Sequence, residues 1–232
     1  FIWLLGRAFK WPREVVGALL ICVPLGNTSF FGFPMIEAFY GSDAIVYGLL
    51  YDQFGSFFGL AIYSTIIIAL YREQDEKPTV GSVSRQILTF PPFIALVIAL
   101  LTKSFTYPEV FQRLIDSLAV TLVPVIMIAV GFQLKFRLPK GSKTPLTIGL
   151  LTKLVLMPAL TIALLFGFGF ESTLVQVTVF ESAMPPMITA GAVAIMAGLA
   201  PRLSAAMVGY GILFAFVSLP IVYELLQWLS AQ

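Results

Sequence analysis

Residues 24–34 (PLGNTSFFGFP) combine polar side chains with residues that interrupt helices. A proline stands at each end, and Asn27, Thr28 and Ser29 lie between two glycines. Proline removes a backbone donor and clashes with the preceding helical turn. An amide and hydroxyls beside exposed backbone donors suit an organic anion, so we expect Asn27, Thr28, Ser29 and Pro34 to contribute to a substrate site.

Residues 180–191 (FESAMPPMITAG) form a second interrupted segment, which also carries an acid. Two consecutive prolines, Pro185 and Pro186, should break a helix and free the carbonyl groups that precede them. Inside a membrane, an ionisable side chain is costly and usually functional. Glu181 is therefore a candidate Na⁺ ligand, together with Ser182 and backbone oxygens, or the carrier of a proton. Pro185 and Pro186 are expected to border the substrate.

The composition places both segments in a membrane. Of the 232 residues, 59% are hydrophobic and 11% are charged, and the mean hydropathy is +0.95. A soluble domain carries about 25% charged residues, so the apolar residues of this chain must face lipid. The apolar runs are longer than the alternating segments, about ten residues each, of a membrane barrel. The sequence therefore predicts an all-α integral membrane protein.

The residue types exclude several kinds of chemistry. The chain has no histidine and a single cysteine, Cys22. Histidine-based triads, histidine metal sites and an internal disulfide are therefore excluded. The acids Asp52, Asp116 and Glu181 show no paired motif of an intramembrane aspartyl enzyme. We expect a protein that is not an enzyme and holds no cofactor.

Seven apolar stretches are long enough to form membrane helices, which need about 20 residues. Residues 1–9 resemble the tail of a further span whose beginning is absent. The seven stretches cover residues 15–40, 44–70, 87–103, 116–136, 145–166, 173–198 and 203–229.

Basic residues indicate the orientation of these spans. Eleven of them lie on the side where the 15–40 span begins, and only two, Lys103 and Arg113, lie on the opposite side. Cytoplasmic loops of membrane proteins carry an excess of lysine and arginine. We therefore expect a multi-pass protein of the cytoplasmic membrane with its C-terminus outside. Topology and lipid headgroups explain the basic loops, and no nucleic-acid partner is expected.

The two interrupted segments occupy matching places in the chain. They belong to the first and the sixth span, which cross the membrane in opposite directions, and each is followed by a short loop and one long span. This pattern is typical of inverted-repeat transporters, in which broken helices cross near the midplane and form the substrate and ion sites.

Four segments resemble the auxin efflux carrier family, which includes the plant PIN-like proteins and their bacterial relatives. Residues 26–41 resemble the first crossover helix of the family, and residues 183–220 resemble its second crossover and last helix. Residues 87–101 and 123–134 are similar to the opening of its second half. The similarity spans nearly the whole chain and is that of a bacterial-type member.

The resemblance implies a ten-helix fold of two inverted five-helix repeats, shared with the bile-acid:sodium symporters. The chain would lack the first two to three spans. Residues 1–72 would end the first repeat, residues 73–86 would form the cytoplasmic loop between repeats, and residues 87–232 would form the second repeat.

The family fold also implies an elevator-like motion of a transport domain against a scaffold. The spans 87–103 and 116–136 would belong to the scaffold, through which a homodimer is possible. The other spans would belong to the transport domain.

The resemblance assigns roles to individual residues. Asn27, as the crossover asparagine, would help to bind a substrate carboxylate. The spacing of Glu181 and Met184 is similar to the sodium site of bile-acid symporters. Many auxin-carrier relatives are not acidic at this position, which favours cation coupling here. Asp52 would complete the ion site or pair with Lys153, which could instead extend toward the cytoplasm.

We therefore expect a secondary active transporter for a small organic anion, such as a carboxylate, coupled to Na⁺ or H⁺. One alternative is an uncoupled, auxin-carrier-like efflux facilitator. Another is a seven-helix receptor or sensor, although the charge bias places the start of the chain inside and the last span has no lysine for a retinal. A channel is a further alternative, which the sequence alone separates poorly from a transporter.

Overall fold

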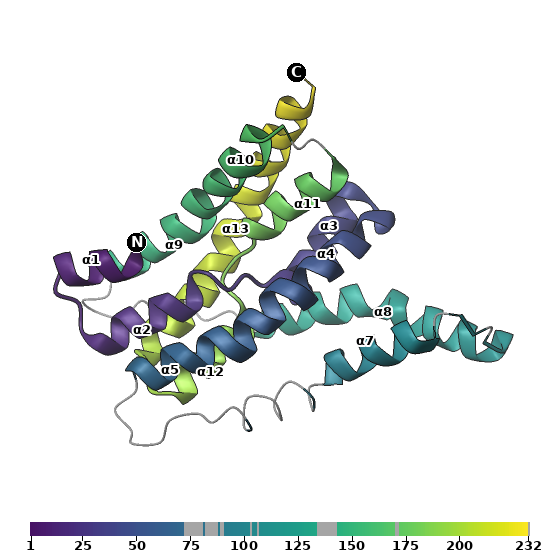
Figure 1. The fold of residues 1–232 in the computed structure, drawn as a ribbon, viewed down its shortest axis with the longest axis horizontal. Coiled ribbons are helices and arrows are strands. Elements are labelled where there is room, and N and C mark those ends of the chain that lie inside the picture. The colour runs from purple at the N-terminus through teal and green to yellow at the C-terminus, as the bar shows by residue number, and fades with distance from the viewer. Residues whose placement is uncertain are drawn as a thin grey trace.

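The computed structural model describes residues 1–71, 81, 88, 91–102, 104–105, 107–133, 143–169 and 172–231. The expected loop between repeats lies outside the described residues, apart from Gly81. Helices dominate the described residues, and the one β-bridge among them joins two short extended segments. The predicted all-α architecture is confirmed (Figure 1).

The first interrupted segment is a helix in two halves. Helix α2 spans Arg13–Cys22, and after a turn at residues 23–24 the chain runs extended from Leu25 to Asn27. A π-helical turn, Thr28–Gly32, leads into helix α3, Phe33–Tyr40. Helix α1, Ile2–Ala8, precedes them.

The second interrupted segment has the same design. Helix α11 spans Thr173–Ser182 and helix α12 spans Ile188–Met196. Between them, Pro185 and Pro186 cannot donate backbone hydrogen bonds, so the helix cannot continue through residues 183–187.

The two extended segments cross and pair with one another. The backbone N–H of Asn27 donates to the carbonyl of Pro185 at 2.8 Å, and that of Met187 donates to the carbonyl of Leu25 at 2.9 Å. Gly26 and Pro186 lie opposite each other as an antiparallel bridge. These bonds satisfy backbone groups that lipid could not. The predicted crossing of two broken helices is therefore present.

Three continuous helices surround the crossing and are long and apolar enough to span a membrane, among the described residues. Ser42–Tyr71 includes α4, two π-helical segments and α5, and Lys143–Gly167 includes α9, a π-helical segment and α10. The third is α13, which contains Pro220. The first of these helices consists of α4 (Ile45–Tyr51), the π-helical segments Asp52–Phe57 and Gly59–Ser64, and α5 (Thr65–Tyr71). The second consists of α9 (Lys143–Leu151), the π-helical segment Thr152–Leu156 and α10 (Met157–Gly167). Helix α13 spans Pro201–Ser230.

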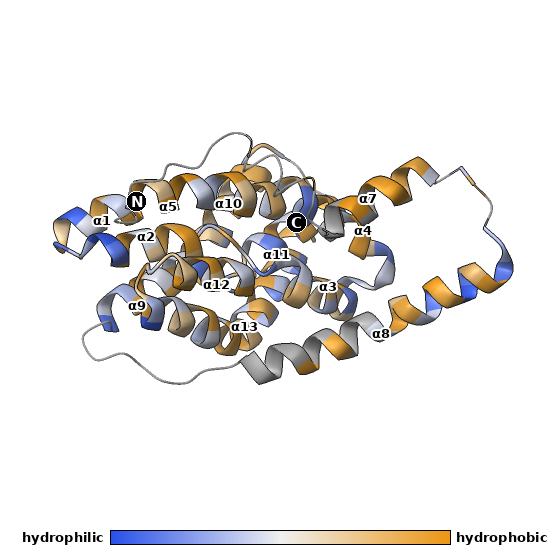
Figure 2. Ribbon diagram, turned by 90° about the horizontal axis from the view of Figure 1, so that it is seen from below, coloured by the Kyte–Doolittle hydropathy of each residue, from blue (hydrophilic) through white to orange (hydrophobic). Residues whose placement is uncertain are grey.

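Helices α7 (Pro91–Thr102) and α8 (Glu109–Gln133) both extend from the same side of this bundle, and they lie apart where they leave it (Figures 1 and 2). Pro91 and Pro92 begin α7. Proline is tolerated there because the N–H groups of the first helical turn have no acceptor within the helix. Helix α8 starts at Glu109, before the expected Asp116, because its first turns are amphipathic: Glu109 and Arg113 pair at 3.3 Å. The described side chains of both helices are mostly exposed, as on a lipid-facing surface.

Candidate functional site

The crossing gathers buried polar side chains in the middle of an apolar bundle. Its surroundings include fully buried apolar residues such as Phe31, Phe180 and Met184. Buried polar groups in lipid-embedded proteins are rare and usually functional. Those at or beside the crossing are Asn27, Thr28, Asp52, Gln53, Ser56, Lys153, Glu181 and Ser182.

Asp52 is the centre of a hydrogen-bonded group that joins the first crossover to the 42–71 helix. Its Oδ1 accepts from the Thr28 hydroxyl at 2.5 Å, and its Oδ2 accepts from the Gln53 amide at 2.9 Å. The hydroxyl groups of Thr28 and Ser56 are 2.9 Å apart and also hydrogen-bonded. The carboxylate of Asp52 is thus held by neutral donors.

Glu181 lies deeper in the protein, and its surroundings differ from those of Asp52. It is fully buried, and neither carboxylate oxygen has a hydrogen-bond partner within the described part of the chain. Two glycines make room for it: a Cβ added to Gly32 would lie 2.8 Å from Oε2, and one added to Gly48 would lie 3.0 Å from Oε1. A carboxylate with two unpaired oxygens is costly unless a cation or a proton accompanies it.

Lys153 supplies a positive charge inside the crossing. Its side chain is 2% exposed, and its Nζ donates to the carbonyl of Ser182 at 3.1 Å. Ser182 is the last residue of α11, so the ammonium lies at the negative end of a half-helix. The two roles considered for Lys153 from the sequence are both wrong. It forms no ion pair with Asp52, because no such pair exists among the described residues, and it does not extend toward water.

The buried charges of the site do not balance. Two carboxylates, Asp52 and Glu181, accompany one ammonium, Lys153, and the charges of Asp52 and Lys153 both act on Glu181. With all three ionised, the site carries one net negative charge. A single monovalent cation would neutralise it. The described residues contain no cluster of three or more acidic, cysteine or histidine side chains that would suit a multivalent metal ion.

Asn27 is the polar residue at the crossing itself. Its backbone N–H is used in the bond to Pro185. Its side chain is fully buried, and neither the amide nitrogen nor the oxygen has a partner among the described residues. The amide therefore has one donor group and one acceptor available for a ligand.

The remaining expected site residues fall into two groups. Pro185 and Pro186 are buried in the second extended segment, where they meet the first. Ser29 is half-buried in the π-helical turn, and Pro34 is buried in the first turn of α3, beyond the crossing.

Ser182 and Met184 differ in what they present to the site. The Ser182 hydroxyl bonds to the Val179 carbonyl at 2.6 Å, so its backbone carbonyl, not its hydroxyl, faces Lys153. Met184 is fully buried in the apolar core.

Part of the site was not predicted from the sequence. Gln53 and Ser56 lie one and four residues after Asp52, and Gly32 and Gly48 make room for Glu181. A structural signal connects several of these residues: Thr28, Asp52 and Lys153 all lie in π-helical segments, as do Gln53 and Ser56. Such segments occur often at functional sites, but no sequence period predicts them.

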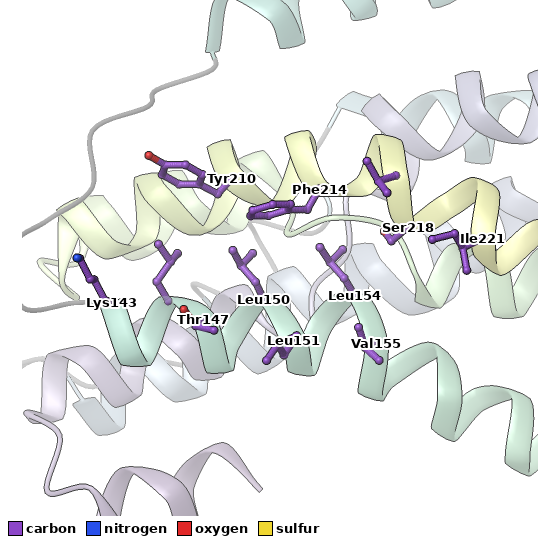
Figure 3. A pocket seen from close by; sticks show the side chains of 12 residues that line it. Lys143, Thr147, Leu150, Leu151, Leu154, Val155, Tyr210, Phe214, Ser218 and Ile221 are labelled. Carbon is purple, nitrogen blue, oxygen red and sulfur yellow. The ribbon is translucent and has the colours of Figure 1, made fainter.

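A separate groove of about 530 Å³ lies between α9 and α13. Its lining is almost wholly apolar, and Lys143 stands at one end (Figure 3). Leu150 and Phe214 face this groove (Figure 3), and none of the buried polar residues of the crossing lines it. It is therefore not part of the polar site.

Comparison with known proteins identifies the family. An uncharacterized transporter of Methanothermobacter thermautotrophicus is 24% identical over 221 residues, or 92% of this chain and 71% of that protein. An uncharacterized transporter of Methanocaldococcus jannaschii is 24% identical over 192 residues, or 79% of this chain and 60% of that protein. The chain thus spans only part of the length of both relatives. The model of the family described as Membrane transport protein matches residues 1–223. The chain therefore belongs to this membrane transport protein family, that of the auxin efflux carriers.

Proposed function

We propose that the whole protein is a secondary active transporter that moves a small organic anion, such as a carboxylate, together with Na⁺ or H⁺. It would lie in the cytoplasmic membrane with its C-terminus outside. The crossing would hold both the coupling cation and the substrate.

The observation that carries this proposal is the state of Glu181. The carboxylate of Glu181 is fully buried, and neither of its oxygens has a partner among the described residues, which is a costly state for an ionised group. A transported cation or proton would supply its missing partner. With all three groups ionised, the site carries one net negative charge, so one monovalent cation per cycle would be sufficient. Asp52 would then support the site through Thr28 and Gln53.

The substrate side of the proposal depends on Asn27 and the half-helices. The Asn27 amide has an unused donor and acceptor at the crossing. Helix α12 begins next to the crossing at Ile188, and the positive end of a helix dipole favours an anion. Such half-helix ends are common anion sites in transporters. A carboxylate bound there would approach the coupling cation closely enough to link their binding.

The mechanical side of the proposal is an elevator-like movement. The helices that carry the polar site form one packed bundle, whereas α7 and α8 project from it (Figure 1). Helix α8 contacts the bundle at the 28–32 turn and at α3. This arrangement suits a scaffold of α7 and α8, with a possible homodimer contact, and a moving unit formed by the other helices.

The experiment uses the full-length carrier, purified and assayed for thermal stability with and without Na⁺ from pH 5 to pH 8. A ligand that binds only the folded state stabilises it by RT ln(1 + [L]/Kd), or about 2.7 kcal/mol at one hundred times Kd. We expect a Na⁺-dependent rise in Tm, or a pH-dependent rise, that Glu181→Gln abolishes. A panel of short-chain mono- and dicarboxylates should give a further rise that depends on the same cation.

Each result has a defined meaning. A Na⁺ effect lost in the variant supports sodium coupling, and a pH effect lost in the variant supports proton coupling. If neither Na⁺ nor pH acts through Glu181 while carboxylates still bind and are transported, the uncoupled facilitator is the better description. Absence of both cation and carboxylate effects would contradict the proposal.

A further inference from the structure

A second polar pocket lies at the corner between α1 and α2, against the end of α5. It has a volume of about 620 Å³ and is lined by three basic and three aromatic side chains. Hydrophilic residues at this corner contrast with the apolar helices beyond it (Figure 2). The polar residues at the crossing do not line it. The six side chains are Arg7, Lys10, Arg13, Trp3, Trp11 and Tyr71.

Stacking and one backbone bond orient the two arginines of this pocket. The guanidinium of Arg7 lies 5.0 Å from the ring centre of Trp3, and that of Arg13 lies 5.9 Å from the ring centre of Tyr71. Arg13 also donates to the carbonyl of Leu70 at 2.5 Å. A stacked guanidinium keeps its N–H edge available and loses less conformational entropy when it binds an anion.

The third cation is held in an unusual backbone conformation. Lys10 has φ of 54°, in the left-handed region where residues with a Cβ are strained. The turn is nevertheless well fixed. The Trp11 N–H donates to the Gly6 carbonyl at 2.9 Å, and a Cβ on Gly6 would lie 2.5 Å from Val16. Glycine would suit this position better on conformational grounds alone.

Among the residues that the structure describes, no carboxylate lines this pocket. Within the described part of the chain, Arg113 and Glu109 form the one ion pair, and they lie on α8. Three cations thus face one pocket without an acidic partner among the described residues. Tryptophan and tyrosine are enriched at the membrane interface, and basic pockets at the ends of membrane helices bind anionic lipid headgroups.

We propose that this corner is a specific binding site for a phosphate group, that of an anionic phospholipid in the leaflet next to α1 and α2. The two arginines would hold the phosphate through their N–H edges, Lys10 would add a third charge, and the tryptophans would border the glycerol and upper acyl region. Bound lipid would join the α1–α2 corner to the end of α5, because Arg13 contacts both.

The test uses the delipidated full-length carrier at fixed salt, since exposed charges are screened. Tm is measured during titration with short-chain phosphatidylglycerol, with phosphatidylcholine and with inorganic phosphate. We expect phosphatidylglycerol to raise Tm at a much lower concentration than phosphatidylcholine. The double variant Arg7→Gln/Lys10→Gln should need at least tenfold more phosphatidylglycerol. If inorganic phosphate raises Tm at the same concentration as phosphatidylglycerol, the result would support a phosphate site but would identify soluble phosphate, and not a lipid, as its ligand.

Two further variants separate this site from general attraction to the membrane. Lys143 is expected on the same side of the membrane as the pocket but does not line it. Lys143→Gln should therefore leave the phosphatidylglycerol titration unchanged. Lys10→Gly should raise or maintain the Tm of the lipid-free protein, because it relieves strain, yet weaken the response to phosphatidylglycerol. The proposal would be overturned if Lys143→Gln weakened the Tm response to phosphatidylglycerol as much as the pocket variants do. An unchanged response in Arg7→Gln/Lys10→Gln would also overturn it.

Discussion

The ammonium of Lys153 lies 3.1 Å from the carbonyl oxygen of Ser182, at the point where α11 ends and the second crossover becomes extended. This contact places a fixed positive charge beside Glu181 and at the negative end of a half-helix. The Lys153 ammonium also lies close to the first crossover segment, because a Cβ atom added to Gly26 would be 3.1 Å from Nζ of Lys153. Lys153 therefore contacts both crossover segments.

Removing this charge should destabilise the carrier. In Lys153→Met, Asp52 and Glu181 lose the buried cation that compensates them, which we expect to cost on the order of 3 kcal/mol of unfolding free energy. The double variant Lys153→Met/Glu181→Gln should recover part of that loss, because it removes one of the uncompensated acids. Unfolding of the full-length protein in detergent measures both, and strictly additive effects would show that the two residues are not coupled.

The two glycines beside Glu181 should determine cation binding. Alanine at Gly32 would place a methyl group 2.8 Å from Oε2. Alanine at Gly48 would place one 2.4 Å from Cδ1 of Ile36 and 3.0 Å from Oε1. We expect either change to displace the carboxylate and to weaken the Na⁺ or proton effect on Tm by at least tenfold. Gly55→Ala is the matched control on the 42–71 helix, since its nearest atoms are 4.0 Å away in Tyr51. A control that weakens the effect equally would contradict this prediction.

The large features of this fold could be predicted from the sequence. Runs of apolar residues mark the long helices, and Pro185 and Pro186 mark a break because proline cannot donate a backbone hydrogen bond. The inferred crossing of the two breaks is present, as the bond from Asn27 to Pro185 and the bond from Met187 to Leu25 show.

Side-chain partners within the site could not be predicted in the same way. Lys153 could face Asp52, water or a carbonyl, and only the packing of the 143–167 helix against α11 decides among them. The π-helical segments shift side-chain directions by about one residue per turn from the α-helical period. The group formed by Thr28, Asp52 and Ser56 therefore has no signature in residue spacing.

Thr28 should be needed for the Asp52 group. In Thr28→Val, Asp52 loses the donor at 2.5 Å and Ser56 loses its hydroxyl partner. A buried acceptor left unsatisfied costs about 1–3 kcal/mol, so Tm should fall and cation binding should weaken. Thr28→Ser keeps the hydroxyl and should retain most of both. Thermal unfolding with a cation titration compares the two variants, and equal behaviour of valine and serine would exclude a role for the hydroxyl.

The crossing itself should be sensitive to a methyl group at Gly211. Helix α13 passes so close to the second break that a Cβ on this glycine would lie 2.4 Å from Cδ of Pro186, which is too rigid to turn aside. Gly211→Ala must then move α13 or Pro186, and overpacking of this kind costs about 1–3 kcal/mol. Because Pro186 lies opposite Gly26 between the two crossover hydrogen bonds, we also expect weaker carboxylate binding. Gly167→Ala, where nothing lies within 4 Å of the added atom, is the control and should leave Tm and binding unchanged. Equal stability of the two variants would mean that α13 can withdraw from Pro186 without disturbing the crossing.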